Sequence, residues 1–375
     1  MPETQDGQAF DEMGYCNVCQ SAEQKMRINW VERRKSLEEI LDKAKADNKN
    51  KPYDCLIPIS GGKDSTFQLH VLVKEYGMRP LAATFSHNWF NSTGMYNLLN
   101  SLEKFDVDHI MFTPKRSQVN SLAKKSLREI GDACWHCHAG VGAYPLKVAI
   151  EYDIQLVVWG ESVAESSSRG TYKDPILKFD QDYFEKVSAK VSVKNMADSN
   201  LPLSDLSIYE QPDAKSYSEA EIQGIHLGDY IFWDEERQTE FVKERYDWKE
   251  TNIEGTYKRY KSAECIMPGV HDFACYLKRG YGRASFHASS DVRAGIVTRE
   301  EAFKNLVPLD QIEPNALAYY SSITGISREE FISVLKGQRH ESLKGVSLPI
   351  IDNPNVNQGP NLFIEDLKRW VELDE

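Results

Sequence analysis

A short apolar run at residues 53–59 is followed at once by Ser60-Gly61-Gly62-Lys63-Asp64-Ser65. The run is typical of a buried strand, and acidic and hydroxyl residues such as Asp64 and Ser65 favour the first turn of a helix. The two glycines allow the chain to turn tightly. Because the free N–H groups and the dipole at a helix start attract anions, this stretch predicts a phosphate-binding loop.

Strand and helix patterns alternate from this loop onward. Further strands are expected at 81–85, 108–112 and 154–159, and helices at 65–76, 91–104, 118–130 and 144–152. Strands that are joined by helical crossovers run parallel. We therefore expect an α/β fold with a doubly wound parallel sheet, and a ligand at the carboxyl ends of its strands.

The composition limits the class of protein and its compartment. The 375 residues carry a formal net charge of −12, and no apolar run approaches the about 18 residues of a membrane span. The polar, acidic start is unlike a secretory signal, so a cytoplasmic protein is expected. The acidic excess argues against broad binding to nucleic-acid backbones, which needs clustered Lys and Arg. In a reducing compartment the seven cysteines are better interpreted as metal ligands, catalytic groups or core residues than as disulfides.

Two Cys-x-x-Cys pairs, Cys16/Cys19 and Cys134/Cys137, have the spacing with which two thiolates reach one metal ion. The pairs can share one tetrahedral Zn²⁺ or serve two separate sites. Iron–sulfur ligation is the alternative, because clusters also take cysteine thiolates. Cys134 and Cys137 can also face a pocket as a redox or packing pair. Candidate additional ligands are His136, His138 and Cys265.

The loop departs from the Walker A pattern, since Ile57 stands where that motif requires its first glycine and Asp64 follows Lys63. Ser-Gly-Gly-x-Asp-Ser instead resembles the PP-loop ATP pyrophosphatases, whose fold is of the adenine nucleotide alpha hydrolase-like type. This resemblance implies that ATP is cleaved between its α and β phosphates and that AMP is transferred to a carbonyl oxygen. Lys63 can then offer a cation to the phosphates, and Asp64 can bind Mg²⁺ or simply cap the helix. The expected ATP-binding residues are Ser60, Gly61, Gly62, Lys63, Asp64, Ser65, Thr66, Phe85 and Gly160.

Four regions are expected along the chain. Residues 1–30 form a short N-terminal segment that carries the first cysteine pair and is similar to a metal-binding unit. Residues 50–165 form the PP-loop ATP-binding domain, and the less regular residues 166–260 form an insertion that covers the active site. Residues 261–375 are expected to be mostly helical, with breaks at Pro314-Asn315 and at 352–360.

Several stretches together resemble one family, the bacterial N-acetyl sugar amidotransferases. They are Phe10-Asp11-Glu12 with Cys16 and Cys19, the PP-loop, Cys134-Trp135-His136-Cys137-His138, Val158-Trp159-Gly160-Glu161, Lys278-Arg279-Gly280-Tyr281-Gly282-Arg283, His287-Ala288-Ser289, Arg293 with Gly295, and Thr298-Arg299-Glu300-Glu301. Members of this family usually carry a further Cys-x-x-Cys just before the segment that matches Met1-Pro2-Glu3-Thr4, and this chain begins at that methionine.

The resemblance implies that an acetamido sugar becomes an acetamidino sugar for lipopolysaccharide O-antigen or flagellar glycans, including those of the pseudaminic and legionaminic acid type. ATP would activate the amide oxygen and ammonia would replace it. The ammonia would come from separate partners similar to the histidine-biosynthesis glutaminase and cyclase subunits. No membrane or nucleic-acid partner is expected.

Other residues are candidates for the chemistry. Glu161 follows a buried strand, so it is expected at the ligand end of the sheet, where it can bind Mg²⁺, orient ammonia or cap a helix. Phe85 ends another strand, where an adenine ring can stack. His287 can act as an acid or base or as a structural hydrogen bonder. Expected catalytic residues are Lys63, Asp64, Glu161 and His287, and expected sugar-binding residues are Lys278, Tyr281, Arg283 and His287.

Two other functions compete with this interpretation. A PP-loop enzyme that inserts sulfur into tRNA shares the loop and often has Cys-x-x-Cys metal sites, although the acidic charge of this chain counts against it. A non-catalytic, metal-stabilised scaffold of a glycan assembly complex would release no pyrophosphate with any substrate.

Overall fold

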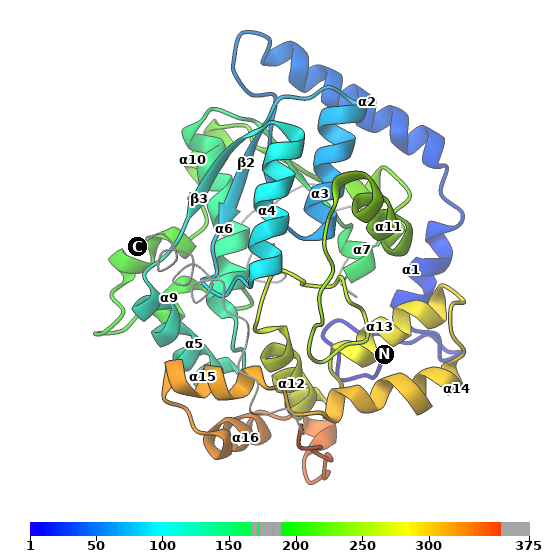
Figure 1. Cartoon of the computed structure of the whole chain (residues 1–375), viewed down its shortest axis with the longest axis vertical. Coiled ribbons are helices and arrows are strands. Elements are labelled where there is room, and N and C mark those ends of the chain that lie inside the picture. Colours follow the sequence, from blue (N-terminus) through cyan, green and yellow to red (C-terminus); the bar gives the residue numbers. More distant parts are fainter. Residues whose placement is uncertain (167–170, 173–182, 184–188, 354–375) are drawn as a thin grey trace, which may run out of the picture.

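A sheet of five parallel strands lies at the centre of the computed structural model, which describes residues 1–166, 171–172, 183 and 189–353 (Figure 1). The strands are β1 (Cys55–Pro58), β2 (Pro80–Phe85), β3 (Asp108–Phe112), β4 (Leu156–Trp159) and β5 (Gln223–His226). Their order across the sheet is β3-β2-β1-β4-β5. The chain thus runs outward from β1 in both directions, which confirms the expected doubly wound α/β fold.

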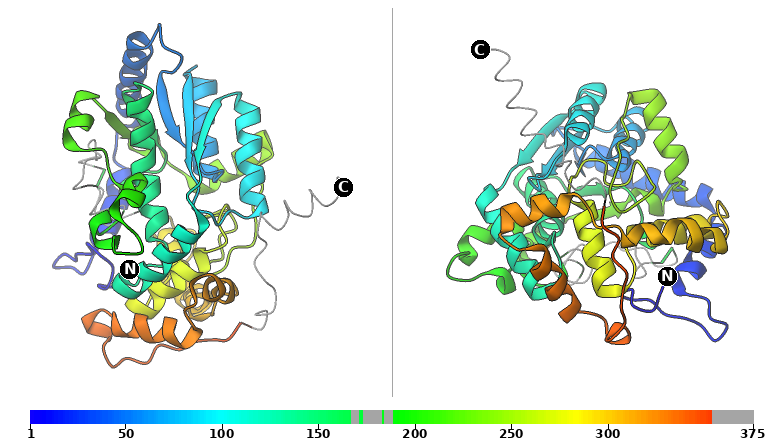
Figure 2. Two further views of the ribbon diagram at one scale, coloured as in Figure 1. Left: turned by 90° about the vertical axis from the view of Figure 1, so that its left-hand side faces the viewer. Right: turned by 60° about the horizontal axis from the view of Figure 1, so that its bottom comes forward.

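Helices cover both faces of this sheet, as the left view of Figure 2 shows. The helices of the described residues, including those that lie away from the sheet, are α1 (Asn17–Lys25), α2 (Trp30–Asp47), α3 (Lys63–Leu69), α4 (Ser92–Phe105), α5 (Arg116–Ile130), α6 (Trp135–Glu151), α7 (Val163–Ser166), α9 (Val193–Met196), α10 (Ala214–Glu219), α11 (Glu235–Tyr246), α12 (Pro268–Arg279), α13 (Arg283–Arg293), α14 (Arg299–Glu301), α15 (Ala316–Thr324) and α16 (Arg328–Gly337). Shorter helical turns are η1 (His70–Glu75), η3 (Leu203–Tyr209), η4 (Leu227–Asp229), η5 (Ala302–Leu306), η6 (Val307–Gln311) and η7 (Glu341–Leu343). In the described part of the chain, none of these helices is both long and apolar enough to cross a membrane.

The strands divide their side chains between two cores, because successive residues of a strand point to opposite faces. Cys55 and Ile57 pack in the core that contains α2, α3, α4 and α11. Leu56, between them, packs in the core that contains α6 and η3. A third core joins α5 to α12, α15 and α16. These last helices lie at one end of the molecule, in yellow to brown in Figure 1.

The structure differs from the sequence-based expectations in two elements. The helix expected at 144–152 begins at Trp135, so the second Cys-x-x-Cys motif lies at a helix start and not in a loop. The less regular region contributes a fifth strand, β5, which pairs with β4. The sequence does not reveal this strand, because Gln223–His226 is only four residues long and carries no alternating pattern of its own. The expected break at 352–360 lies mostly outside the described residues.

Gly140 allows α6 to lie close to the sheet. A Cβ atom at this position would be 2.2 Å from the Phe85 ring, far inside van der Waals contact. Phe85 is buried and packs against Phe112, Tyr144 and Tyr209, so its ring has little room to move. The approach of α6 to β2 therefore depends on a glycine.

Gly140→Ala is expected to lower the free energy of unfolding by about 1–3 kcal/mol, the usual effect of overpacking a core. Gly337→Ala is the matched control, because a Cβ atom at that helical glycine would meet no other part of the protein within 4 Å. The control is expected to keep or raise stability, since alanine favours helix. Urea unfolding midpoints measure both changes, and equal midpoints would contradict the close approach.

Candidate active site

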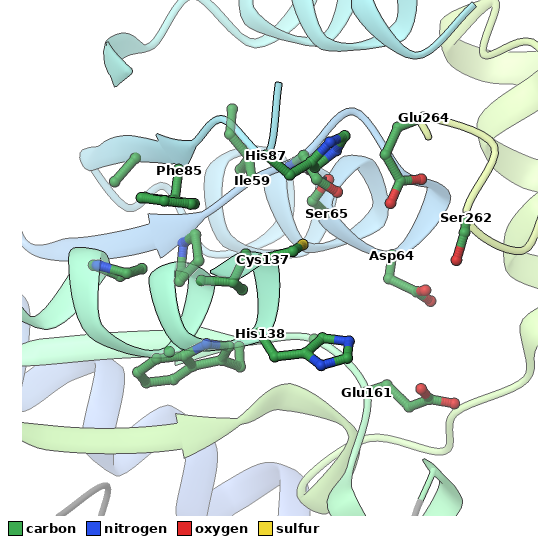
Figure 3. A pocket seen from close by; sticks show the side chains of 18 of the residues that line it. Ile59, Asp64, Ser65, Phe85, His87, Cys137, His138, Glu161, Ser262 and Glu264 are labelled. Atoms are coloured by element: carbon green, nitrogen blue, oxygen red, sulfur yellow. Dashed lines mark hydrogen bonds between the residues drawn. The ribbon is translucent and has the colours of Figure 1, made fainter. Parts of the chain in front are cut away.

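A cavity of about 650 Å³ opens at the carboxyl ends of β1, β2 and β4 (Figure 3). Asp64, Glu161 and Ser262 come from three separate segments and lie around the same opening. The residues that line it include Ser60, Asp64, Ser65, Phe85, His87, Cys137, His138, Gly160, Glu161, Lys190, Ser262, Glu264 and His271. The cavity therefore lies where the doubly wound fold predicts a ligand.

The loop Ser60–Gly62 makes the turn between β1 and α3. Gly61 has a φ of +79°, and a Cβ atom there would lie 2.6 Å from the carbonyl oxygen of Gly94 in α4. The carbonyl oxygen of Gly61 accepts a 2.9 Å hydrogen bond from the indole Nε1 of Trp248. The loop is thus fixed from behind by α4 and Trp248, and Gly62, which precedes α3, has no side chain to cap that helix. An uncapped helix start at a cavity suits an anion.

The hydroxyl groups of the loop differ in position. Ser60 and Ser65 line the cavity, and the Ser65 hydroxyl donates to the Gly62 carbonyl at 3.0 Å. Thr66 is fully buried, and its hydroxyl lies 3.2 Å from the same carbonyl and 3.0 Å from Ser101 Oγ. Thr66 therefore braces the loop from inside the core, whereas the two serines lie at the wall of the cavity.

Lys63 and Asp64 form an ion pair at the start of α3. The Lys63 ammonium is almost completely buried and lies 2.5 Å from Asp64 Oδ1. It also stands 5.4 Å from the centre of the Tyr260 ring. Asp64 is partly exposed and lines the cavity, while Lys63 is not among the lining residues. In this arrangement Lys63 holds the carboxylate in place.

Glu161 follows β4 and belongs to a second buried charge cluster. Its Oε1 lies 3.7 Å from Lys261 Nζ, and Lys261 also pairs with Glu235 at the start of α11. Burial raises the pKa of Glu161 well above its usual value, against the opposing charge of Lys261. Burial acts on Glu235 too, but the cations Lys261 and Lys63 outweigh it and lower the pKa of that carboxyl. The pKa values of the two carboxyls are therefore shifted in opposite directions, with Lys261 paired to both.

Arg283 and His287 lie behind the loop that carries Lys261, Ser262 and Glu264. Arg283 donates to Ser262 Oγ at 2.7 Å and pairs with Asp272 at 2.6 Å. The Nδ1 atom of His287 lies 2.7 Å from Thr256 Oγ1. Burial, together with the charges of Lys261 and Arg283, lowers the pKa of His287 well below its usual value. Both residues support the cavity wall and are not among its lining residues.

Two expected sugar-binding residues lie elsewhere. The Lys278 ammonium donates to the carbonyls of Ile130 and Gly131, at 2.9 and 3.1 Å, at the end of α5. Tyr281 is buried, and its pKa is raised by burial. Neither is a lining residue of the cavity. Phe85 and Gly160 do line it, although Phe85 is also part of the core under α6.

The cysteine pairs occupy different surroundings. The Sγ atoms of Cys16 and Cys19 lie 3.3 Å apart, near the charge of Arg293. Cys134, Cys137 and Cys265 share the third core, and Cys137 lines the cavity. Burial raises the pKa of Cys134 well above its usual value, and the neighbouring thiols of Cys265 and Cys137 add to this effect. The structure therefore brings Cys265 to the second pair.

Three charged residues of the site are not evident from the sequence. Glu235, Lys261 and Glu264 lie far from the loop in sequence, and none belongs to a motif with a known spacing. Burial raises the pKa of Glu264, which lines the cavity. The one available signal is Cys265, which neighbours Glu264 and is a candidate ligand beside the second cysteine pair.

Part of the chain matches a known protein family. Residues 254–344 match the family model described as LPS biosynthesis protein WbpG-like, C-terminal domain. This match confirms the expected resemblance to lipopolysaccharide biosynthesis proteins, and its segment contributes Ser262, Glu264 and His271 to the lining of the cavity. An uncharacterized protein of Methanocaldococcus jannaschii is 30% identical over 80 residues, which are 21% of this chain and 28% of that protein.

Two solved structures are similar to the chain at low identity. The U34-tRNA thiolase NcsA from Methanococcus maripaludis, with its 4Fe–4S cluster, is 14% identical with a TM-score of 0.34, over 83% of this chain and 85% of that one. NMN synthetase from Francisella tularensis is 15% identical with a TM-score of 0.28, over 60% of this chain and 98% of that one.

His87 makes the stability of the site dependent on pH. Burial lowers its pKa to about 4, so the unfolded chain binds a proton below pH ~6.5 that the folded chain refuses. Stability therefore falls as the pH drops from about 6.5 to 4, with a slope of at most about 1.4 kcal/mol per pH unit from this histidine. Replacing His87 by Gln is expected to flatten the pH dependence of the unfolding free energy across this window.

The measurement is a series of urea unfolding curves between these pH values, with His340→Gln, at an exposed histidine, as the matched control. An unchanged slope in the His87 variant would contradict this, because it would mean that the wild-type imidazole binds a proton equally well in the folded and unfolded chains.

Proposed function

We propose that this chain, whose residues 254–344 carry the C-terminal domain of WbpG-like lipopolysaccharide biosynthesis proteins, is an ATP-dependent amidotransferase that converts the acetamido group of a sugar into an acetamidino group. One observation carries the proposal. The phosphate loop after β1 and the family-matched segment line one cavity together, where Ser60, Asp64 and Glu264 all face the same space.

ATP would bind with its phosphates at the loop. The uncapped start of α3 and the hydroxyl of Ser60 offer hydrogen-bond donors to them. Three carboxyl groups, Asp64, Glu161 and Glu264, line the cavity, and a bare polyphosphate would be repelled by them. Asp64 and Glu161 would hold the Mg²⁺ that accompanies ATP, since this ion prefers carboxylate and phosphate oxygens.

The reaction has two balanced steps. The amide oxygen of the N-acetyl group attacks the α-phosphorus, the bond to the bridging oxygen breaks, and pyrophosphate leaves with that electron pair. Ammonia then adds to the activated carbon, and AMP leaves with the former amide oxygen. The added nitrogen must lose a proton. Glu264 is placed to accept it, because a carboxyl with a raised pKa is a stronger base.

The described residues supply orientation and charge for these steps. Lys63 fixes Asp64, and Lys261 lies between Glu161 and Glu235, so the carboxyls of Asp64 and Glu161 have defined positions before substrates bind. Such preorganised charge is the main source of rate enhancement in many enzymes. As the family resemblance implies, ammonia would come from a separate glutaminase, and the acceptor would be an N-acetyl sugar of the lipopolysaccharide or nonulosonic acid type.

A metal cofactor at the second cysteine pair would lie beside the cavity, because Cys137 lines it. A single zinc ion holds thiolates at about 2.3 Å, which places their sulfur atoms about 4 Å apart. Within the described residues, the thiols of Cys134, Cys137 and Cys265 do not form such a close group. An iron–sulfur cluster spreads its thiolates over several irons and accepts thiols that are further apart. The three thiols would hold it, and the same feature favours tRNA sulfur insertion as the second candidate function.

Pyrophosphate release from ATP tests the first function. With ammonium and a panel of N-acetyl sugars, the protein is expected to release AMP and pyrophosphate only when the correct sugar is present. Asp64→Asn and Glu161→Gln are expected to lower kcat by about 100-fold or more, because each would remove a ligand of the Mg²⁺ that offsets the charge on the leaving pyrophosphate. Asp42→Asn, at an exposed carboxylate of α2, is the matched control and keeps the wild-type rate.

Two results would contradict this function. Release that depends on tRNA and not on any sugar would favour the sulfur-insertion enzyme. No release with any substrate, from folded protein with its partner glutaminase added, would favour the scaffold.

A further inference from the structure

A cluster of three potential metal ligands lies on the same cavity and is separate from the cysteines. Asp132, His138 and His271 form the one group, within the parts of the chain that are described, whose ligand atoms all lie within 4.8 Å of one another. His138 and His271 line the cavity, and Asp132 lies in the turn between α5 and α6. None of the three has a place in the nucleotide chemistry.

Asp132 presents to this cluster a carboxylate oxygen that has no hydrogen bond. The residue is 4% exposed, and its Oδ1 accepts a 2.8 Å hydrogen bond from the Cys134 N–H. Its Oδ2 is buried and has no hydrogen bond, although His138 Nδ1 lies 3.4 Å away and Lys190 Nζ 3.8 Å away. A buried carboxylate oxygen without a hydrogen bond is costly, and a bound metal ion would compensate this cost more closely than Lys190 does at 3.8 Å.

His271 is held in the orientation of a metal ligand. Its Nδ1 atom lies 3.0 Å from Asp272 Oδ1, and Asp272 is itself held by Arg283 at 2.6 Å. A carboxylate that receives one ring N–H fixes the tautomer and leaves the other nitrogen free to coordinate. The ring centres of His138 and His271 lie 5.3 Å apart, and one ligand atom of each ring lies within 4.8 Å of the other and of the Asp132 carboxylate.

We propose that Asp132, His138 and His271 bind one divalent transition-metal ion of the zinc type in the wall of the cavity. Two imidazoles and one carboxylate are a ligand set that zinc accepts, and three protein ligands leave a position open to the cavity. Zinc holds nitrogen and oxygen ligands at about 2.0–2.2 Å, so modest side-chain rotations would close the present spacing. The proposal does not depend on the proposed function.

Lys190 is the group that opposes the ion. Its side chain is 39% exposed and interacts with Asp132 at the edge of the cluster, so it can turn toward solvent when a cation binds. Like charges at this distance repel even near a protein surface. Lys190→Met is therefore expected to tighten metal binding severalfold, the opposite direction from the loss of a ligand.

Cobalt titration of the chelator-treated full chain tests the site, because Co²⁺ reports its ligands by its colour. We expect one equivalent to give visible d–d bands without the intense near-ultraviolet band of a thiolate ligand. His138→Gln, His271→Gln and Asp132→Asn are each expected to weaken this binding more than 100-fold. Asp272→Asn is expected to weaken it about 10–100-fold through the lost orientation of His271. Competition with Zn²⁺ alone should bleach the bands.

The matched control is His340→Gln, at an exposed histidine outside the cluster, which should bind Co²⁺ as the wild type does. Circular dichroism separates lost binding from lost folding, and Lys190→Met keeps the test decisive if a ligand variant misfolds. Bands that survive all three ligand substitutions, a thiolate band that disappears only in Cys134→Ser or Cys137→Ser, or weaker binding by Lys190→Met would each overturn the proposal.

Discussion

The parallel pairing of β1 with β4 is the constraint on which the whole site depends. Leu56 lies opposite Val157, so β1 ends at Pro58 and β4 ends at Trp159 at the same edge of the sheet. The next residues of these two strands are the phosphate loop and Gly160-Glu161. Because the chain winds outward from β1 in both directions, no helix crosses between these two ends in the part of the chain that the structure describes, and a cavity can form there.

The cavity is completed by a segment from far along the chain. A Cβ atom on Gly94 would lie 2.3 Å from the Cα of Glu264, and the Asn91 N–H donates to the Glu264 carbonyl at 3.0 Å. This close contact presses the family-matched segment against the start of α4, next to the loop that α4 also supports. Glu264 therefore owes its position to backbone packing and not to its own charge.

Charge balance within the site follows from this packing. Four carboxyl groups, those of Asp64, Glu161, Glu235 and Glu264, are gathered near the cations Lys63, Lys261 and Arg283. Carboxylates are in excess, and burial raises the pKa of Glu161 and Glu264. A site that is short of positive charge when empty suits a ligand that arrives with a divalent cation, as a nucleoside triphosphate does.

Short sequence patterns predicted those parts of the site whose residues are neighbours along the chain. The strand, the glycine turn and the helix start of the phosphate loop are neighbours in sequence, and so are Trp159, Gly160 and Glu161. Lys261, Glu264 and His271 could not be predicted in this way, because their place is set by contacts between α4, α6 and α12 that no short motif records. Lys278 illustrates the reverse case, since a basic residue in a family motif caps α5 instead of facing the cavity.

An isotope experiment on oxygen transfer tests whether ATP adenylates the acetamido oxygen of the sugar. A sugar whose acetamido oxygen is labelled with ¹⁸O would be converted in the presence of ATP and ammonium, and the products would be analysed by mass spectrometry. We expect the label in AMP, because the amide oxygen attacks the α-phosphorus and departs from the sugar as part of AMP. Label in water, in inorganic phosphate or in the recovered sugar alone would contradict the adenylation of that oxygen.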